Sequence, residues 1–236
     1  MNGPMRSFRI GPGAAALLIA ALACCAHSPS APPSASTANS PTAHSVAVNP
    51  AHIKRIVGDL PPGYEVTTGV PDDVSPRTIW NLPADAAAVE SAPAQCAALA
   101  DPGNGRGRSA QGVSASGTGG IIRAVVVALP GPAQLDHNVV EQCPRWSMNS
   151  GHTTASVQLT DAPHVNDADT VGMLAETKSS VESGTEIDSR TYTFVAYLGN
   201  YYAFTTLTTD PGSALPALPP KFAADLLVKT VSALRG

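Results

Sequence analysis

Residues 161–169 hold the densest group of side chains that could do chemistry, among them Asp161, His164 and Asp167. Carboxylates beside an imidazole can hold a divalent cation. The segment lacks the glycine and the distal glutamate of an EF-hand loop, however, and it lies between two predicted strands, where a solvated acidic turn is common. We therefore predict an acidic turn here, with no metal site and no cofactor.

The sequence does not contain the motifs of the common catalytic sites. It has no G-x-S-x-G nucleophile elbow, no G-x-x-x-x-G-K-[ST] phosphate loop, no G-x-G-x-x-G after a strand and no H-E-x-x-H zinc motif. His137 is expected in a helix and His152 just before a strand, which favours surface or capping roles over catalysis. We therefore predict no catalytic residues and a protein that is not an enzyme.

Four aromatic residues remain as candidates for a binding site. Trp80 and Trp146 are expected in or beside loops, whereas Tyr197 and Tyr202 are expected on adjacent strands. Aromatic residues often anchor ligands in pockets, but tryptophans over a sheet edge and half-buried strand tyrosines also occur for packing alone. We name all four as candidate ligand-binding residues, and the packing alternative stays open.

Two of the four cysteines lie on different predicted helices of the main domain. An exported domain with two such cysteines predicts a disulfide between Cys96 and Cys143. The alternative is a redox or nucleophilic thiol, which is less consistent with a chain that has no C-x-x-C spacing and no histidine in a recognisable partner motif. We therefore favour a structural disulfide over a reactive thiol for these two cysteines.

The beginning of the chain is typical of an export signal. Two arginines precede an uncharged apolar run over 11–23, which is shorter than the roughly 20 residues of a spanning helix. The run ends in Ala-Leu-Ala-Cys-Cys, which resembles a bacterial lipobox. We predict a lipoprotein signal peptide over 1–23 and acylation of Cys24, with Cys25 as the alternative. A plain secretory signal with an incidental cysteine pair also stays open.

The composition limits the partners and the number of domains. The chain has 236 residues, with 14 Lys+Arg and 18 Asp+Glu, and this net charge of −4 gives no general attraction to nucleic acid. Residues 24–50 are rich in Ser, Ala, Pro and Thr, so we predict a disordered tether, which is either bare or O-glycosylated. Residues 51–236 are long enough for one core and predict one domain.

The pattern of this domain predicts helices interspersed with hairpins. We expect helices over 51–60, 84–99, 133–143 and 222–234, a loop over 71–83, and strands over 64–68, 111–117, 121–129, 153–159, 170–176 and 185–198, followed by a further strand. The Gly199-Asn200 turn predicts a two-residue hairpin that pairs Tyr197 with Tyr202 and Val195 with Phe204. This order favours an α+β fold with a twisted antiparallel sheet and helices packed on one face.

Several segments together resemble a known family. The lipobox, the tether, Leu-Pro-Pro-Gly-Tyr-Glu-Val at 60–66, Pro-Ala-Gln-Cys-Ala-Ala-Leu-Ala-Asp at 93–101 and the later Cys143 are similar to mycobacterial lipoproteins related to the extracellular sensor domain of PknH-type Ser/Thr kinases. The resemblance implies an antiparallel sheet with helices against it and a large cleft for an unidentified ligand. The kinase domains have two disulfides, and this domain has cysteines for one. No catalytic residues are implied.

These observations predict a lipoprotein anchored by its N-terminal lipid on the extracytoplasmic side of the cell membrane. Its sensor-like domain is expected to bind a small molecule, a lipid or an envelope glycan in a cleft. The alternative is an interaction or structural lipoprotein of the envelope, which acts through contacts with a protein partner that the sequence does not identify. Neither role involves nucleic acid.

The lipid anchor can be tested directly by mass spectrometry of protein purified from its native membrane. We expect Cys24 at the mature N-terminus with acyl chains attached, because stable anchoring needs two or more lipid signals. Cys24→Ala should move the protein out of the membrane fraction, whereas Cys25→Ala should leave it there. An unprocessed or unacylated wild-type product would contradict the prediction.

Overall fold

The computed structural model describes residues 47–181 and 184–236. The predicted signal peptide over 1–23, Cys24 with its alternative Cys25, and most of the predicted tether lie outside the described residues. In the part of the chain that is described, no helix is both long and apolar enough to cross a membrane.

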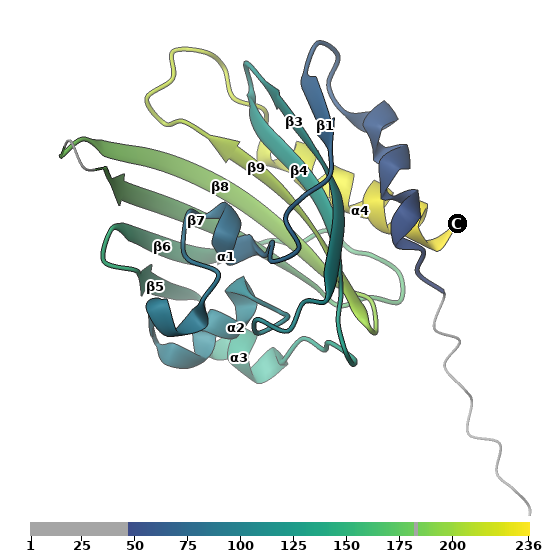
Figure 1. Ribbon diagram of the computed structural model, residues 1–236, viewed down its shortest axis with the longest axis horizontal. Helices are drawn as coiled ribbons and strands as arrows, with labels where there is room; N and C mark the ends of the chain where they lie inside the picture. Colours follow the sequence, from purple (N-terminus) through teal and green to yellow (C-terminus); the bar gives the residue numbers. More distant parts are fainter. Residues whose placement is uncertain (1–46, 182–183) are drawn as a thin grey trace, which may run out of the picture. The chain divides into compact units, whose positions relative to one another are not determined.

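Nine antiparallel strands form one open sheet in the order β1-β3-β4-β9-β8-β7-β6-β5-β2 (Figure 1). The two edges of the sheet are its shortest strands, β1 and β2. The strands are β1 (Glu65–Thr68), β2 (Glu90–Ala92), β3 (Ser109–Gly117), β4 (Gly120–Ala128), β5 (Arg145–Asn149), β6 (Thr153–Thr160), β7 (Thr170–Ser180), β8 (Glu186–Tyr197) and β9 (Tyr201–Thr209).

Helices lie against both faces of this sheet. The longest, α4, and the 3₁₀ helix η1 pack side by side on one face, and the short helices α1, α2 and α3 lie on the other (Figure 1). The helices are η1 (Pro50–Asp59), α1 (Pro76–Ile79), η2 (Ala86–Ala88), η3 (Ala94–Cys96), α2 (Ala97–Ala100), α3 (His137–Gln142) and α4 (Pro220–Arg235). The domain therefore has two apolar cores, one on each face.

The core under α4 follows from the spacing of its apolar residues. Leu226, Leu227 and Val231 recur at helical spacing and are buried against β4, β8 and β9. The Thr205 hydroxyl on β9 donates a hydrogen bond of 2.7 Å to the Ala223 carbonyl oxygen, which joins the helix to the sheet. On the exposed side of the helix, Lys221 pairs with Asp225 at a nitrogen–oxygen distance of 2.6 Å.

The core on the opposite face contains the two tryptophans and the disulfide. Trp80 is fully buried, and its indole N–H donates to the Thr193 hydroxyl at 3.1 Å. Trp146 on β5 is also buried. The predicted disulfide between Cys96 and Cys143 is confirmed, and it joins the end of η3 to the residue that follows α3. The cover of this face is therefore made of short helices linked covalently.

The structure confirms the α+β class, the single domain, the twisted antiparallel sheet and the helix packing, and it adds the short helices on the second face. The hairpin register is also confirmed, since Tyr197 pairs with Tyr202 and Val195 with Phe204. Gly199 in this turn has a φ of 68°, a backbone conformation that costs glycine little.

The helix predicted over 84–99 is wrong. This segment forms η2, then the edge strand β2, then η3 and the start of α2. Pro93 has no backbone N–H and interrupts the helical pattern, while Glu90, Ser91 and Ala92 pair with the free edge of β5. Tertiary pairing has therefore overridden the helix propensity of the alanines.

Three smaller differences have local causes. The loop predicted over 71–83 contains α1, because Ser75 caps it and Pro76 occupies its first position. The helix predicted over 133–143 begins only at His137, where the Asp136 carboxylate accepts hydrogen bonds from the first free N–H groups. The short strand β5 follows it directly and has no counterpart in the sequence prediction.

The Cys96→Ala/Cys143→Ala variant tests the contribution of the disulfide. The bond spans a sequence separation of 47, and chain-entropy arithmetic for such a loop gives about 4 kcal/mol of stabilisation. We expect the free energy of unfolding to fall by that amount in urea titrations, and the melting temperature to fall by roughly 10 °C. An unchanged urea midpoint, or two titratable thiols in the folded wild type, would contradict this.

Candidate functional site

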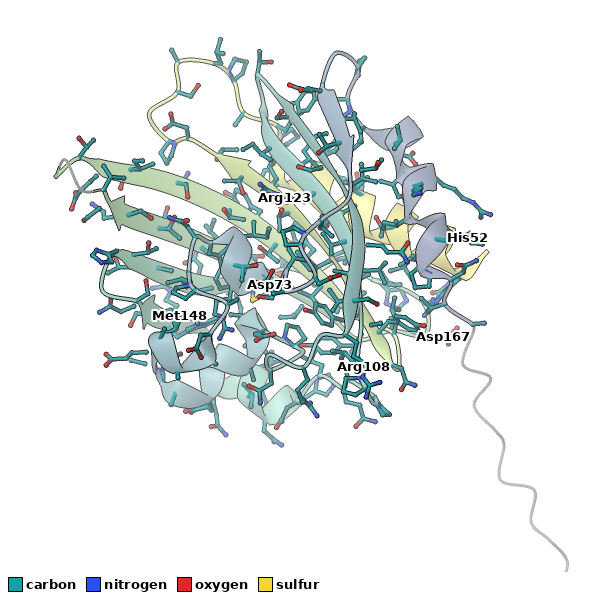
Figure 2. All side chains as sticks on the ribbon, in the orientation of Figure 1. His52, Asp73, Arg108, Arg123, Met148 and Asp167 are labelled. Atoms are coloured by element: carbon teal, nitrogen blue, oxygen red, sulfur yellow. A yellow bond between two sulfur atoms is a disulfide. The ribbon has the colours of Figure 1, made fainter. Side chains whose placement is uncertain are left out.

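A cavity of about 380 Å³ opens beside α1, on the face of the sheet that carries the short helices. Its rim has three exposed carboxylates, and three of its deeper residues are buried polar side chains. Asp73 of this rim lies next to α1 in Figure 2. We call it the Arg77 cavity, and its main polar residues are Asp72, Asp73, Asp85, Arg77, Asp101 and Tyr202.

A local capping arrangement holds Arg77 in place. The Ser75 backbone N–H donates to the Thr78 hydroxyl at 3.0 Å, and the Thr78 N–H donates back to Ser75 Oγ at 3.4 Å. This reciprocal cap defines the start of α1 and so sets the direction of its first turn. Arg77 in that turn is 3% exposed, which is rare for an arginine without a charged partner.

The partner of Arg77 is Asp101, which directly follows α2 and is 6% exposed. Arg77 Nη2 lies 3.2 Å from Asp101 Oδ2 and also donates to the Ala84 carbonyl oxygen. The same Oδ2 accepts the Gly105 N–H at 2.8 Å. A buried ion pair needs such additional hydrogen bonds to offset the cost of removing both charges from water.

The floor of the cavity has hydrogen-bonding groups to spare. Arg77 Nε is buried, and no acceptor for it exists among the described residues. Within the same part of the chain, Asp101 Oδ1 and the Tyr202 hydroxyl also make no hydrogen bond. Buried polar groups are nearly always satisfied in folded proteins, so a floor with unused donors and acceptors is a candidate for ligand recognition.

Burial keeps the tyrosine hydroxyls near this site protonated. Burial raises the pKa of Tyr202, and the Asp101 carboxylate raises it further while Arg77 opposes the change. Burial also raises the pKa of Tyr197, with a smaller contribution from Asp169. Both phenols are therefore neutral at physiological pH and can donate as well as accept hydrogen bonds.

The structure separates the four predicted aromatic candidates into two pairs. Trp80 and Trp146 pack in the core and line neither cavity of this site. Tyr202 lines the Arg77 cavity, and Tyr197 lines a second cavity of about 390 Å³, the Tyr197 cavity, whose wall also includes Asp101. The sequence analysis did not identify Asp101 or Arg77. Their only sequence signals are the helix cap before Arg77 and the short helix before Asp101, and neither signal indicates a site.

The acidic turn over 161–169 is held by protein groups. The Arg235 guanidinium donates to the carbonyl oxygens of Asn166 and Asp167, the latter at 2.8 Å, and the Thr170 hydroxyl donates to the Pro163 carbonyl oxygen. Over residues 47–181 and 184–236 the structure has no group of three His, Cys, Asp or Glu side chains able to hold a metal ion.

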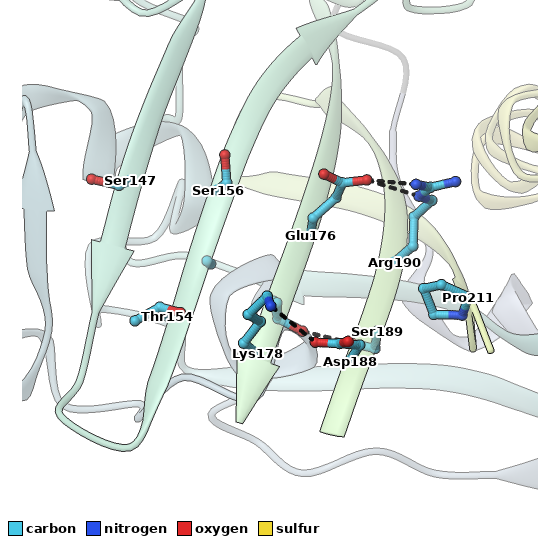
Figure 3. Close-up of a pocket in the computed structure, with 11 residues that line it drawn as sticks. Ser147, Thr154, Ser156, Glu176, Lys178, Asp188, Ser189, Arg190 and Pro211 are labelled. Atoms are coloured by element: carbon cyan, nitrogen blue, oxygen red, sulfur yellow. Dashed lines mark hydrogen bonds and ion pairs between the residues drawn. The ribbon is translucent and has the colours of Figure 1, made fainter. Parts of the chain in front are cut away.

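A groove on the opposite face is less suited to recognition, although it is similar in size. It has a volume of about 410 Å³ and lies over β5 to β8 (Figure 3). Glu176 pairs with Arg190 at 2.6 Å and Lys178 with Asp188 at 4.0 Å, and all four side chains are exposed. None of the described residues that line this groove has a buried polar side-chain atom without a hydrogen-bond partner, whereas the Arg77 cavity has Arg77 Nε, so we place the candidate site in the Arg77 cavity.

Substitutions at the ion pair should reveal the coupling between its two charges. Asp101→Leu and Arg77→Met each leave a buried charge without a partner, so each should cost about 3–5 kcal/mol. The double variant should cost less than the sum, because it removes both charges. Urea unfolding measures all three, with Lys221→Met at the exposed pair as a control of small effect. Additive losses would contradict the coupling.

The raised pKa values predict a loss of stability at alkaline pH. Tyrosines in the unfolded chain ionise near pH 10, whereas Tyr197 and Tyr202 remain protonated in the folded domain. Above that pH the unfolded state binds fewer protons than the folded state, so the free energy of unfolding falls as pH rises. Urea midpoints measured on both sides of pH 10 should show this fall, and the Tyr197→Phe/Tyr202→Phe variant should reduce it. An equally steep fall in the variant would refute the assignment.

Comparisons with known proteins place the domain in a family. The solved structures that resemble it include the following two. One is an uncharacterized protein of Mycobacterium smegmatis, the Rv0999 ortholog, with a TM-score of 0.58, 22% identity, and coverage of 80% of this chain and 98% of that chain. This likeness shows a shared fold. The other is the extracellular domain of PknH from Mycobacterium tuberculosis, with a TM-score of 0.41, 12% identity, and coverage of 80% and 92%.

The resemblance to mycobacterial proteins and to the PknH extracellular domain therefore has counterparts among solved structures. No curated protein matches the chain. The family model of a domain of unknown function, DUF5642, matches residues 49–235, which is most of the chain. The chain belongs to the DUF5642 family.

Proposed function

We propose that this protein is a membrane-anchored, extracytoplasmic lipoprotein whose sensor-like domain binds a small polar ligand in the Arg77 cavity. The observation that carries the proposal is the buried pair of Arg77 and Asp101 at the cavity floor. A buried ion pair is weak evidence for stability, because an apolar pair of similar volume often serves equally well. A function in recognition explains why these charges lie beside a cavity with unused hydrogen-bonding groups.

The charge of the cavity limits the ligand. Asp72, Asp73 and Asp85 add three carboxylates at the rim to the balanced pair at the floor. Their combined field disfavours phosphate and carboxylate groups, since negative charges around the cavity entrance repel an approaching anion. The ligand that fits is therefore uncharged or cationic, and it has oxygen or nitrogen atoms that can both accept and donate hydrogen bonds.

The location of the protein is proposed from two further observations. The disulfide between Cys96 and Cys143 suits an oxidising compartment outside the cytoplasm. The sequence over 1–23 with the lipobox cysteine Cys24 supports export and lipid attachment. We also propose that the domain is not an enzyme, because the sequence has none of the common catalytic motifs.

A second candidate function is an envelope protein that acts through protein contacts. A groove of about 450 Å³ lies where β4 and β8 begin and β9 ends, and it is lined by Ile121, Ile187 and Leu215, which are 37%, 54% and 54% exposed. Exposed apolar side chains that gather in one place are typical of interaction surfaces. Capture of a protein through cross-linkers at this groove, without any ligand effect on stability, would favour this function.

Thermal unfolding of the mature protein with fractionated envelope extract tests the main proposal. A ligand at 100 times its dissociation constant stabilises the folded state by about 2.7 kcal/mol, which corresponds to a rise of roughly 5–10 °C in melting temperature. We expect this rise with neutral or cationic fractions and not with anionic ones. Asp73→Asn and Tyr202→Phe should weaken it, because both residues line the cavity.

Glu176→Gln in the opposite groove is the matched control and should leave the rise unchanged. No rise with any fraction, or a rise that survives in both cavity variants, would contradict ligand binding in the Arg77 cavity.

A further inference from the structure

The Arg77 cavity and the Tyr197 cavity lie next to each other and share Asp101 and the turn after it as a wall. Asp101 lines both cavities, and the turn that follows it alternates between them. Gly105 and Gly107 line the Arg77 cavity, whereas Asn104 and Arg106 line the Tyr197 cavity. Alternate residues of this one segment therefore line two neighbouring cavities.

Hydrogen bonds within the turn keep this wall compact. The Asn104 N–H donates to the Asp101 carbonyl oxygen at 2.9 Å, and the Gly105 N–H donates to the Asp101 carboxylate at 2.8 Å. Asn104 and Gly105 have φ values of 47° and 69°, the left-handed conformation that a tight turn of this kind needs. The side chain that pairs with Arg77 therefore also organises the partition between the cavities.

On the sheet, Tyr197 and Tyr202 are likewise neighbours that line different cavities. Tyr197 on β8 and Tyr202 on β9 are direct cross-strand partners, and each lines a different cavity. Each phenol is neutral and buried, and each can donate one hydrogen bond and accept others. The same recognition group is therefore present twice, on adjacent strands, with Asp101 on the wall between the two cavities.

The polar groups of both cavities suit hydroxyl groups better than anions. Asn104 and Gln134 supply amides to the Tyr197 cavity, and Arg106 and Asp136 supply one charge of each sign. Together with the acidic rim of the Arg77 cavity, carboxylates outnumber guanidinium groups over the whole lining. A hydroxyl group both donates and accepts, so a ligand with many hydroxyl groups can use such a lining without carrying charge.

We propose that the two cavities are adjacent subsites for an uncharged linear oligosaccharide, with one sugar unit in the Arg77 cavity and the next units beyond Asp101 in the Tyr197 cavity. This inference rests on the proposed function, since it names the ligand class of the same site. Each cavity is within the size range of small-ligand sites, which start at about 300 Å³. A ligand of repeating units matches two similar compartments that lie side by side.

Isothermal titration of the mature protein with sugars of increasing length tests this inference. The probes are glucose and maltotetraose, N-acetylglucosamine and its β-1,4-linked tetramer, and tetragalacturonate as an anionic chain. In at least one neutral series, the dissociation constant should fall at least tenfold from the monosaccharide to the tetrasaccharide. Tetragalacturonate should not bind, because its carboxylates meet an acidic lining.

Two matched tryptophan variants locate the added affinity. Ala98 is exposed on α2 and lines the Tyr197 cavity, so Ala98→Trp should fill that cavity without disturbing the core. Ala88 is exposed on η2 and lines neither cavity, so Ala88→Trp is the control. Ala98→Trp should abolish the gain with chain length and leave the monosaccharide affinity unchanged, whereas Ala88→Trp should change neither.

The outcomes separate this inference from the proposed function. Tetrasaccharides that bind no better than monosaccharides, or a gain that persists in Ala98→Trp, would overturn the oligosaccharide site while binding in the Arg77 cavity still stands. The same holds if no sugar binds but an envelope fraction stabilises the protein. If neither sugars nor envelope fractions have any effect, both proposals are wrong.

Discussion

Both faces of the open sheet carry apolar clusters, and each cluster must be covered because exposed β-branched and aromatic side chains would be costly in water. The two covers differ in construction. On one face the amphipathic helix α4 covers the apolar cluster together with η1. An ion pair joins the two helices, with Lys229 Nζ 2.8 Å from Asp59 Oδ1. On the other face several short segments cover the apolar cluster, and the disulfide links two of them. Cavities between them are a consequence of this piecewise cover.

Short sequence patterns were enough to predict those strands and helices whose apolar residues recur at regular spacing. Alternation in β3 and β6, the continuous apolar run of β4 and the helical stripe of α4 identify these elements, and Gly199-Asn200 sets a register that the structure reproduces. The segment over 84–99 could not be predicted in the same way. Its conformation depends on the edge of β5, which lies more than fifty positions further along the chain, and helix propensity carries no information about that edge.

The candidate site was only partly predictable for a similar reason. Tyrosines on adjacent strands are visible in the sequence once the hairpin is recognised, so Tyr197 and Tyr202 could be named. Arg77 and Asp101 come from two short helices whose positions are determined by the packing around them. An arginine and an aspartate at that separation are usually solvated surface residues, and only the folded structure shows that both are buried.

The covalent link between Cys96 and Cys143 makes the folding equilibrium of the domain sensitive to reduction. In a reducing cytosol the thiols stay apart, and the ratio of unfolded to folded chains is higher by roughly a thousandfold than in the oxidised protein. Oxidation shifts this equilibrium back toward the folded state. The stability of the domain therefore depends on the redox state of its surroundings, with the folded form favoured where the disulfide can form.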